Sequence, residues 1–216
     1  MKKKILSLVT TTILCSAINT TPTLASEGLF DFTDKERWQI RMRSIYMKPV
    51  VDSTTSINGS VNASDDTVPE IDFTYFFTKN VAAELILAST ENNMDAEATN
   101  SGNLDLGDTR LLPPTLTLQY HMAPESTIRP YVGAGVNYTV FYNEKVGKDI
   151  NSIKYSDNFG YAVQAGLDYM LDENVGINLD VKRLYLETDV LINDGAVTAD
   201  VKLDPWIIGA GFTYKF

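Results

Sequence analysis

The sequence predicts an all-β fold, an eight-stranded antiparallel transmembrane β-barrel with short periplasmic turns and longer extracellular loops. Three observations support this prediction. Eight successive runs alternate apolar and polar residues, the connections between them are alternately short and long, and no run of 18 or more apolar residues follows the first twenty positions of the 216. A transmembrane helix needs about 20 apolar residues, whereas a barrel strand crosses the membrane with an alternating pattern.

Residues 1–25 are typical of a cleaved secretory signal peptide. Three consecutive lysines precede a short apolar stretch, and Ala25 offers a small residue before a cleavage point. The stretch is too short for a membrane anchor. The single cysteine, Cys15, lies within it and follows Leu14, where a lipoprotein signal needs a small residue. We therefore expect a mature barrel of residues 26–216 without disulfides.

Each alternating run predicts one strand. In the second run, Ile71, Phe73 and Tyr75 alternate with Asp72 and Thr74. Successive side chains of a strand point to opposite sides, so each run has one apolar and one polar face. In chain order, the apolar rows start at Trp38, Ile71, Val81, Leu112, Val132, Phe159, Val175 and Trp206. The predicted strands span residues 38–51, 69–78, 81–90, 111–122, 128–142, 158–171, 175–191 and 199–216.

The lengths of the connections orient the predicted barrel. Three connections are short, at residues 79–80, 123–127 and 172–174. Longer polar connections occupy residues 52–68, 91–110 and 143–157, and a shorter one lies near 192–198. An even number of strands with short turns at one end is typical of outer-membrane barrels. This layout places both termini and the short turns in the periplasm.

A soluble eight-stranded barrel or sandwich is the main alternative fold, since it would show the same alternation with its apolar face inward. Two features favour the membrane. Glycines such as Gly133 and Gly209 lie in the polar rows, where a narrow lumen leaves little room. Aromatic residues stand at the ends of the apolar rows, as in an interfacial girdle. These residues are Trp38, Phe77, Tyr120, Tyr142, Phe159, Tyr169, Trp206 and Tyr214.

Several segments together resemble one family of outer-membrane proteins. They are residues 75–80, 112–115, 119–121, 130–139, 204–206 and 211–216. In these segments the chain resembles the OmpW family, and Pro130 to Thr139 is the most specific stretch. The resemblance implies an eight-stranded barrel in the outer membrane of a Gram-negative-type bacterium and passage of small hydrophobic molecules. It also implies an assembly signal of C-terminal aromatic residues, Phe212, Tyr214 and Phe216, read by the barrel-assembly machinery.

The interior of the periplasmic half is predicted to be polar. An eight-stranded barrel is just wide enough for its own side chains, so a wide aqueous pore is not expected. Inward residues of both signs can pair there, since an unpaired buried ion is strongly unfavourable. We predict a polar plug, and the alternative is an ordinary packed interior without a role in transport. The predicted plug residues are Arg41, Arg43, Glu84, Gln119, His121, Arg129, Asp168, Asp180 and Lys215, with Asn178 beside them.

The inward rows of the outer half are mainly apolar, which predicts a pocket open to the outside. The predicted pathway residues are Ile45, Met47, Leu111, Pro113, Leu203 and Ile207. An apolar solute would meet the plug below this pocket, so a sideways exit into lipid is the easier route. Pro113 and Pro114 lack N–H groups, which predicts a lateral opening beside them. Alternatively, the two prolines only mark the end of a strand.

Other classes of function find little support. The net charge of −10 argues against nucleic acid as a partner, because phosphate binding needs a basic face. His121 is the single histidine and lies at the periplasmic end, away from lipid A head groups, so we predict no catalysis. The segment 133–138 lacks the third glycine of a dinucleotide loop, and no cysteine–histidine cluster suggests a transition metal. We predict no cofactor.

Two functions fit the predicted barrel. The first is passive uptake of small hydrophobic molecules through the outer pocket, with outer-membrane lipid and these solutes as partners. The second is a non-transporting surface barrel whose extracellular loops act in adhesion or partner binding. Transport requires apolar inward residues in the outer half, whereas adhesion requires only the loop tips.

Overall fold

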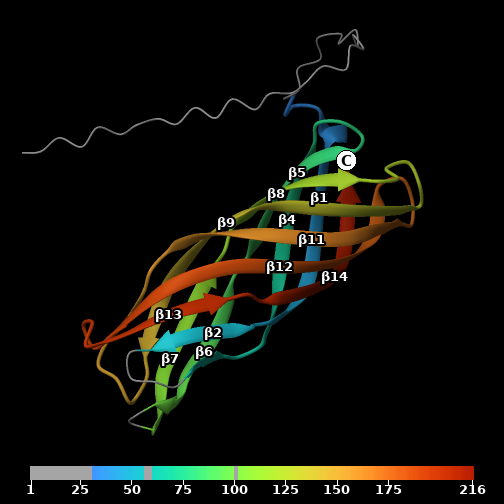
Figure 1. Ribbon diagram of the computed structural model, residues 1–216. Helices are drawn as coiled ribbons and strands as arrows, with labels where there is room; N and C mark the ends of the chain where they lie inside the picture. Colours follow the sequence, from blue (N-terminus) through green and yellow to red (C-terminus); the bar gives the residue numbers. More distant parts are fainter. Residues whose placement is uncertain (1–30, 56–59, 100–101) are drawn as a thin grey trace, which may run out of the picture. The chain divides into compact units, whose positions relative to one another are not determined.

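Eight antiparallel strands close into a barrel in the computed structural model of the chain (Figure 1). The structure describes residues 31–55, 60–99 and 102–216. The signal peptide predicted for residues 1–25 lies outside the described residues. In the described part of the chain, no helix is long and apolar enough to cross a membrane.

The barrel strands follow one another around the wall in chain order. They are β1 (Trp38–Lys48), β4 (Asp66–Phe76), β5 (Val81–Ala88), β8 (Thr115–His121), β9 (Ile128–Val146), β11 (Asn158–Met170), β12 (Val175–Ile192) and β14 (Trp206–Lys215). β14 pairs with β12 on one side and with β1 on the other, so the wall has no free edge at this level. The predicted eight-stranded antiparallel barrel is confirmed.

The two faces of the wall differ in polarity. In β8, Thr117 and Gln119 point inward and are buried, whereas Leu116, Leu118 and Tyr120 are more than half exposed on the outside. A soluble barrel has the reverse arrangement, with its apolar face inside. The outward apolar band is therefore the surface that meets lipid, and the soluble alternative does not hold.

The longer connections contain further strands where the sequence predicted loops. β6 (Thr90–Thr99) and β7 (Gly102–Leu112) form a hairpin that pairs with β3 (Ser60–Ala63) and the outer part of β9. β13 (Val197–Leu203) joins the outer part of β12 to β2 (Val51–Thr55), and β10 (Ile153–Tyr155) also pairs with β12. Figure 1 shows β2, β6, β7 and β13 at the barrel end opposite to the C-terminus. A three-residue 3₁₀ turn, η1 (Lys35–Arg37), precedes β1.

The interior changes polarity partway along the barrel. The inward row of β12 reads Asn178, Asp180 and Lys182 from the periplasmic side and continues as Leu184 and Leu186. Its outward row changes in the opposite sense, from Ile177, Leu179 and Val181 to Glu187 and Asp189. The largest cluster of buried apolar side chains accordingly fills the outer half of the lumen. Water replaces lipid around the wall where the polar residues move outside.

Candidate functional site

Buried charged side chains fill the lower part of the lumen in two layers. In the layer nearer the periplasm, Arg41 on β1 donates from Nε and Nη2 to the two carboxylate oxygens of Asp168 on β11, at 3.2 and 2.8 Å. Its Nη1 donates to Glu84 on β5 and, at 3.1 Å, to Thr74 on β4. Such a two-point arginine–carboxylate pair is among the stronger hydrogen-bonded contacts. One guanidinium thus connects strands on different sides of the barrel.

The second layer is built around Arg43, two residues further along β1. Its Nε donates to Glu70 at 2.9 Å, its Nη2 to Asp72, and its Nη1 to Asn178 Oδ1 at 2.9 Å. Lys182 on β12 donates to the same oxygen of Glu70 at 2.6 Å. Glu70 therefore bridges two cations near the change from polar to apolar interior.

The described buried residues include three such cations and five carboxylates, which we call the polar network. The network consists of Arg41, Arg43, Lys182, Glu70, Asp72, Glu84, Asp168 and Asp180. Tyr131 adds a neutral donor, and its hydroxyl lies 2.8 Å from Asp180. A Cβ at Gly209 would come within 3.2 Å of the Arg43 side chain, so glycine leaves space for this guanidinium. The lumen at this height is packed with paired charges.

The predicted plug residues divide into two groups. Seven are buried at or beside the polar network, with Gln119 donating to Glu84 and one His121 ring nitrogen 3.0 Å from Gln119 Oε1. The other two lie at the periplasmic rim. Arg129 donates to the carbonyl of a turn residue, and Lys215 lies over the ring of Phe76. These two residues do not join the network in this structure.

Sequence reasoning missed three members of the network, Glu70, Asp72 and Lys182. All three stand in the polar rows of their runs, so the alternation could have identified them. Counting along each strand from its turn does not identify them as residues of the periplasmic half. Barrel strands are tilted and staggered, so equal counts from the turns do not give equal heights.

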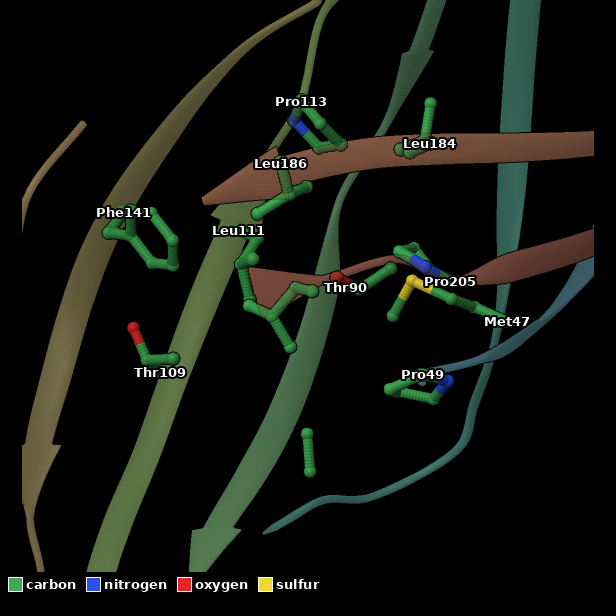
Figure 2. Close-up of a pocket in the computed structure, with 12 residues that line it drawn as sticks. Met47, Pro49, Thr90, Thr109, Leu111, Pro113, Phe141, Leu184, Leu186 and Pro205 are labelled. Carbon is green, nitrogen blue, oxygen red and sulfur yellow. The ribbon is translucent and has the colours of Figure 1, made fainter. Parts of the chain in front are cut away.

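An apolar pocket, whose upper part is shown in Figure 2, lies directly above the polar network. Its upper part is a cavity of about 30 Å³ lined by Met47, Leu111, Pro113 and Leu203, among others. The six predicted pathway residues all line this pocket, although their part in transport stays a prediction.

The lower part of the pocket, about 20 Å³, connects the apolar region to the charges below it. Ile45 and Ile207 line its walls, and Glu70 and Lys182 line it as well. Met47, Thr90, Pro113 and Leu184 line both parts, so the two cavities are neighbours. An apolar molecule moving inward through the pocket would therefore reach a salt bridge.

Beside the pocket, the backbone pairing of the wall is interrupted, but the register is the same on both sides of the interruption. Ile86 pairs with Thr115, and Thr90 pairs with Leu111 in the same register. The intervening residues are therefore aligned, with Ala88 opposite Pro113. In the described wall, residues 87–89 form no backbone pairs with residues 112–114. This interruption lies at the same height along the barrel as the pocket, since Pro113 lines both cavities.

The two prolines affect different seams of the wall. Tyr138 N donates to the Pro114 carbonyl at 3.1 Å, so Pro114 faces β9. In an antiparallel pair, neighbouring residues face opposite partner strands, and Pro113 therefore faces Ala88. Each proline lacks the N–H that would form the second hydrogen bond of its pair. The connection between β7 and β8 is thus held less firmly to both of its neighbours.

Side chains on the outer surface connect the strands across this region. The hydroxyl oxygens of Ser89 and Tyr142 lie 2.6 Å apart. Just beyond them, Glu91 accepts hydrogen bonds from Lys145 and Arg110, each with a contact of 2.8 Å. These contacts, first that with Lys145, lower the pKa of the half-buried Glu91 carboxyl. They hold β6, β7 and β9 together next to the interrupted backbone pairing.

The remaining predicted residues lie near the C-terminus. Phe212, Tyr214 and Phe216 are exposed on the outward face, where the predicted assembly signal would be accessible. Their recognition by the assembly machinery stays a prediction. Within the described ranges, no group of three or more histidine, cysteine, aspartate or glutamate residues could hold a metal ion.

A closed barrel with an outward apolar band and a polar interior defines an outer-membrane β-barrel protein. The family model described as the OmpW family matches residues 36–216. The chain belongs to the OmpW family, and the resemblance seen in its sequence segments is confirmed.

Individual relatives agree with this assignment. The chain is 43% identical over 189 residues to the outer-membrane protein y4mB of Sinorhizobium fredii, covering 83% of this chain and 80% of that protein. It is 35% identical over 152 residues to outer membrane protein W of Vibrio cholerae, covering 66% and 70%. The crystal structure of OprG from Pseudomonas aeruginosa superposes with a TM-score of 0.78 at 30% identity, covering 83% and 95%. The protein is located in the outer membrane.

Proposed function

We propose that this protein takes up small hydrophobic molecules passively, through the outward-facing apolar pocket and a lateral exit into the membrane. The observation that carries the proposal is the change of polarity inside the barrel, where an apolar pocket rests on paired buried charges. A solute that continued straight to the periplasm would have to separate these pairs, which is strongly unfavourable in a buried site. Leaving through the side wall avoids that step.

The interrupted wall supports the lateral exit. Pro113 lines the pocket and faces Ala88, and neither neighbour of the β7–β8 connection receives a backbone hydrogen bond from Pro113 or Pro114, which lack N–H groups. Fewer bonds must break here than in a fully paired part of the wall for a solute to pass. The exit lies beside Tyr138, an outward aromatic residue of the kind found at the membrane interface.

Uptake requires the pocket to widen. Cavities of about 30 and 20 Å³ each have room for about one water molecule. A solute of several carbon atoms must therefore displace the side chains that line them. Met47 lies at the junction of the two cavities, and the unbranched methionine side chain adapts readily to a new shape.

Uptake by intact cells tests the proposal. N-phenyl-1-naphthylamine, a small apolar dye that fluoresces in lipid, is added to cells with and without the protein. We expect faster dye uptake with the protein, and loss of the gain in Leu111→Asp with Ile207→Asp, because two carboxylates in the pocket disfavour an apolar solute. The control, Leu111→Ile with Ile207→Leu, keeps the volume and apolar character and should retain uptake.

Heat-modifiable migration on a gel confirms that each variant forms a barrel. If the folded wild-type protein gives no gain in uptake, the transport proposal is wrong. That result would favour the second function, a surface barrel that binds partners through its extracellular strands.

A further inference from the structure

Two buried hydroxyl groups interrupt the apolar lining of the upper cavity. Thr90 on β6 and Thr109 on β7 are only 3% and 1% exposed, and both line the upper cavity (Figure 2). Neither hydroxyl has a hydrogen-bond partner among the described residues. Buried polar groups in proteins are nearly always paired, so two unpaired hydroxyls in one pocket call for an explanation.

The local strand geometry directs both hydroxyls to one wall. Thr90 pairs with Leu111, and Thr109 lies two residues from Leu111 on the same inward row of β7. Residues in this diagonal relation lie within reach of one small molecule. The pairing of β7 with β9 shifts by one residue between Asp108 and Arg110, and the extra residue lies on β9, so Thr109 keeps its place on the inward row of β7.

We infer that the pocket is a binding site for small neutral amphipathic molecules, with an apolar body and one hydrogen-bonding group such as a hydroxyl or a carbonyl. A threonine hydroxyl can both donate and accept, so either group of a ligand can be satisfied. The apolar body contacts Leu111, Leu184 and Leu203. The inference rests on the proposed uptake function and defines its substrate class.

The two hydroxyls also lie at different depths along the proposed uptake route. Thr109 lines the upper cavity, whereas Thr90 lines both the upper and the lower one. Pro113 lines both cavities as well, so Thr90 lies at the height of the interrupted wall. The polar group of a solute meets Thr109 first and Thr90 second, and reaches the proposed exit with a hydrogen bond still available.

A hydrocarbon and a charged molecule are both less suitable ligands. A hydrocarbon leaves the two hydroxyls unpaired in an apolar site, where an unpaired polar group is costly. A charged group would enter a lining whose nearest ions, Glu70 and Lys182, already pair with each other. The pocket therefore selects for one neutral polar group on a small apolar body.

A matched pair of fluorescent ligands tests the inference with the full-length barrel in lipid nanodiscs. 2-Naphthol and naphthalene share one ring system and differ by a hydroxyl group. Partition into empty nanodiscs is measured and subtracted for each. We expect the wild-type protein to bind 2-naphthol about three- to tenfold more tightly than naphthalene, as one net hydrogen bond provides.

Thr90→Val with Thr109→Val removes the hydroxyls and keeps the side-chain shape. This double variant should lose the preference for 2-naphthol and bind naphthalene at least as well as before. Thr213→Val is the matched control, because Thr213 is equally buried and unpartnered among the described residues but pairs with Arg41 near the periplasmic end. It should leave both affinities unchanged.

The outcomes separate this inference from the proposed function. Equal binding of both ligands by the wild-type protein would overturn the inference and leave the pocket and uptake intact. The same conclusion follows if the preference persists in the double variant or disappears in Thr213→Val. Binding of neither ligand by a heat-modifiable barrel would reject the proposed function as well. The comparison of the two ligands needs only wild-type protein, so a variant that misfolds does not prevent the test.

Discussion

Arg43 illustrates how one buried ion depends on partners from three other strands. Its guanidinium contacts Glu70 and Asp72 on β4 and Asn178 on β12, and lies 3.6 Å from Asp180. It also donates to the Tyr131 hydroxyl on β9 at 3.3 Å. The alternation in the sequence correctly placed Arg43 inside the barrel. Its partners could not be paired from sequence, because they depend on the register and stagger of strands far apart in the chain.

Removing Arg43 should destabilise the barrel strongly. In Arg43→Met, three carboxylates remain near a single cation, Lys182, and breaking a buried ion pair costs about 3–5 kcal/mol. The control is Arg129→Met at the rim, which should change the free energy of unfolding by less than about 0.5 kcal/mol. Both are measured by urea unfolding in phospholipid vesicles. Equal losses in the two variants would contradict the assignment of Arg43 to a buried network.

Pro113 and Pro114, which connect β7 to β8, show what one short segment contributes. A missing N–H is a chemical property of proline, so the sequence alone predicted a weak point in the wall. The structure adds that Pro113 faces β5 and Pro114 faces β9, which follows from the hydrogen bond of Tyr138. This detail requires the register, which a hydrophobic pattern does not contain.

Restoring the two N–H groups should seal the wall. Pro113→Val with Pro114→Val supplies one donor to each seam, and valine favours a strand. We expect about 1 kcal/mol of added stability per new hydrogen bond and uptake of the apolar dye that is several-fold slower. Pro69→Val is the control, because Pro69 lies on β4, on the far side of β5 from the two prolines and opposite Ser44 of β1. It should leave uptake unchanged, and unaltered uptake in the double variant as well would rule out an exit beside these prolines.

The extracellular elements were the least predictable from the sequence. Residues 91–110 are rich in polar and acidic side chains, and they were expected to form a loop, yet they contain most of β6 and β7. Strands above the membrane expose their polar row to water and bury the apolar one, as Leu106 shows. The alternation there is opposite to that of a lipid-facing strand and is interrupted by bulges, including one between Met94 and Asp95. A sequence pattern of apolar outward rows therefore does not identify these extracellular strands.

At the scale of the whole molecule, polarity is organised by height along the barrel. Below the change at Lys182 and Leu184, the outside is apolar and the inside polar, and above it both faces reverse. The same reversal therefore determines both the outer boundary of the lipid-facing band and the lower end of the pocket. The sequence contains the eight rows, but which face of each is inside follows only from closure of the barrel. The proposed route, from an apolar pocket sideways into lipid, depends on these two boundaries having the same height.

Two leucines on one outward row test where the membrane ends. Leu179 and Leu191 both lie on the outside of β12 and are 50% and 40% exposed, below and above the reversal. Leu179→Arg should cost about 2–4 kcal/mol of unfolding free energy in phospholipid vesicles, the range for arginine facing the middle of a bilayer. Leu191→Arg should cost about 0–1 kcal/mol, because this position faces water. Similar costs at both positions would show that the reversal of polarity along β12 does not mark the edge of the membrane.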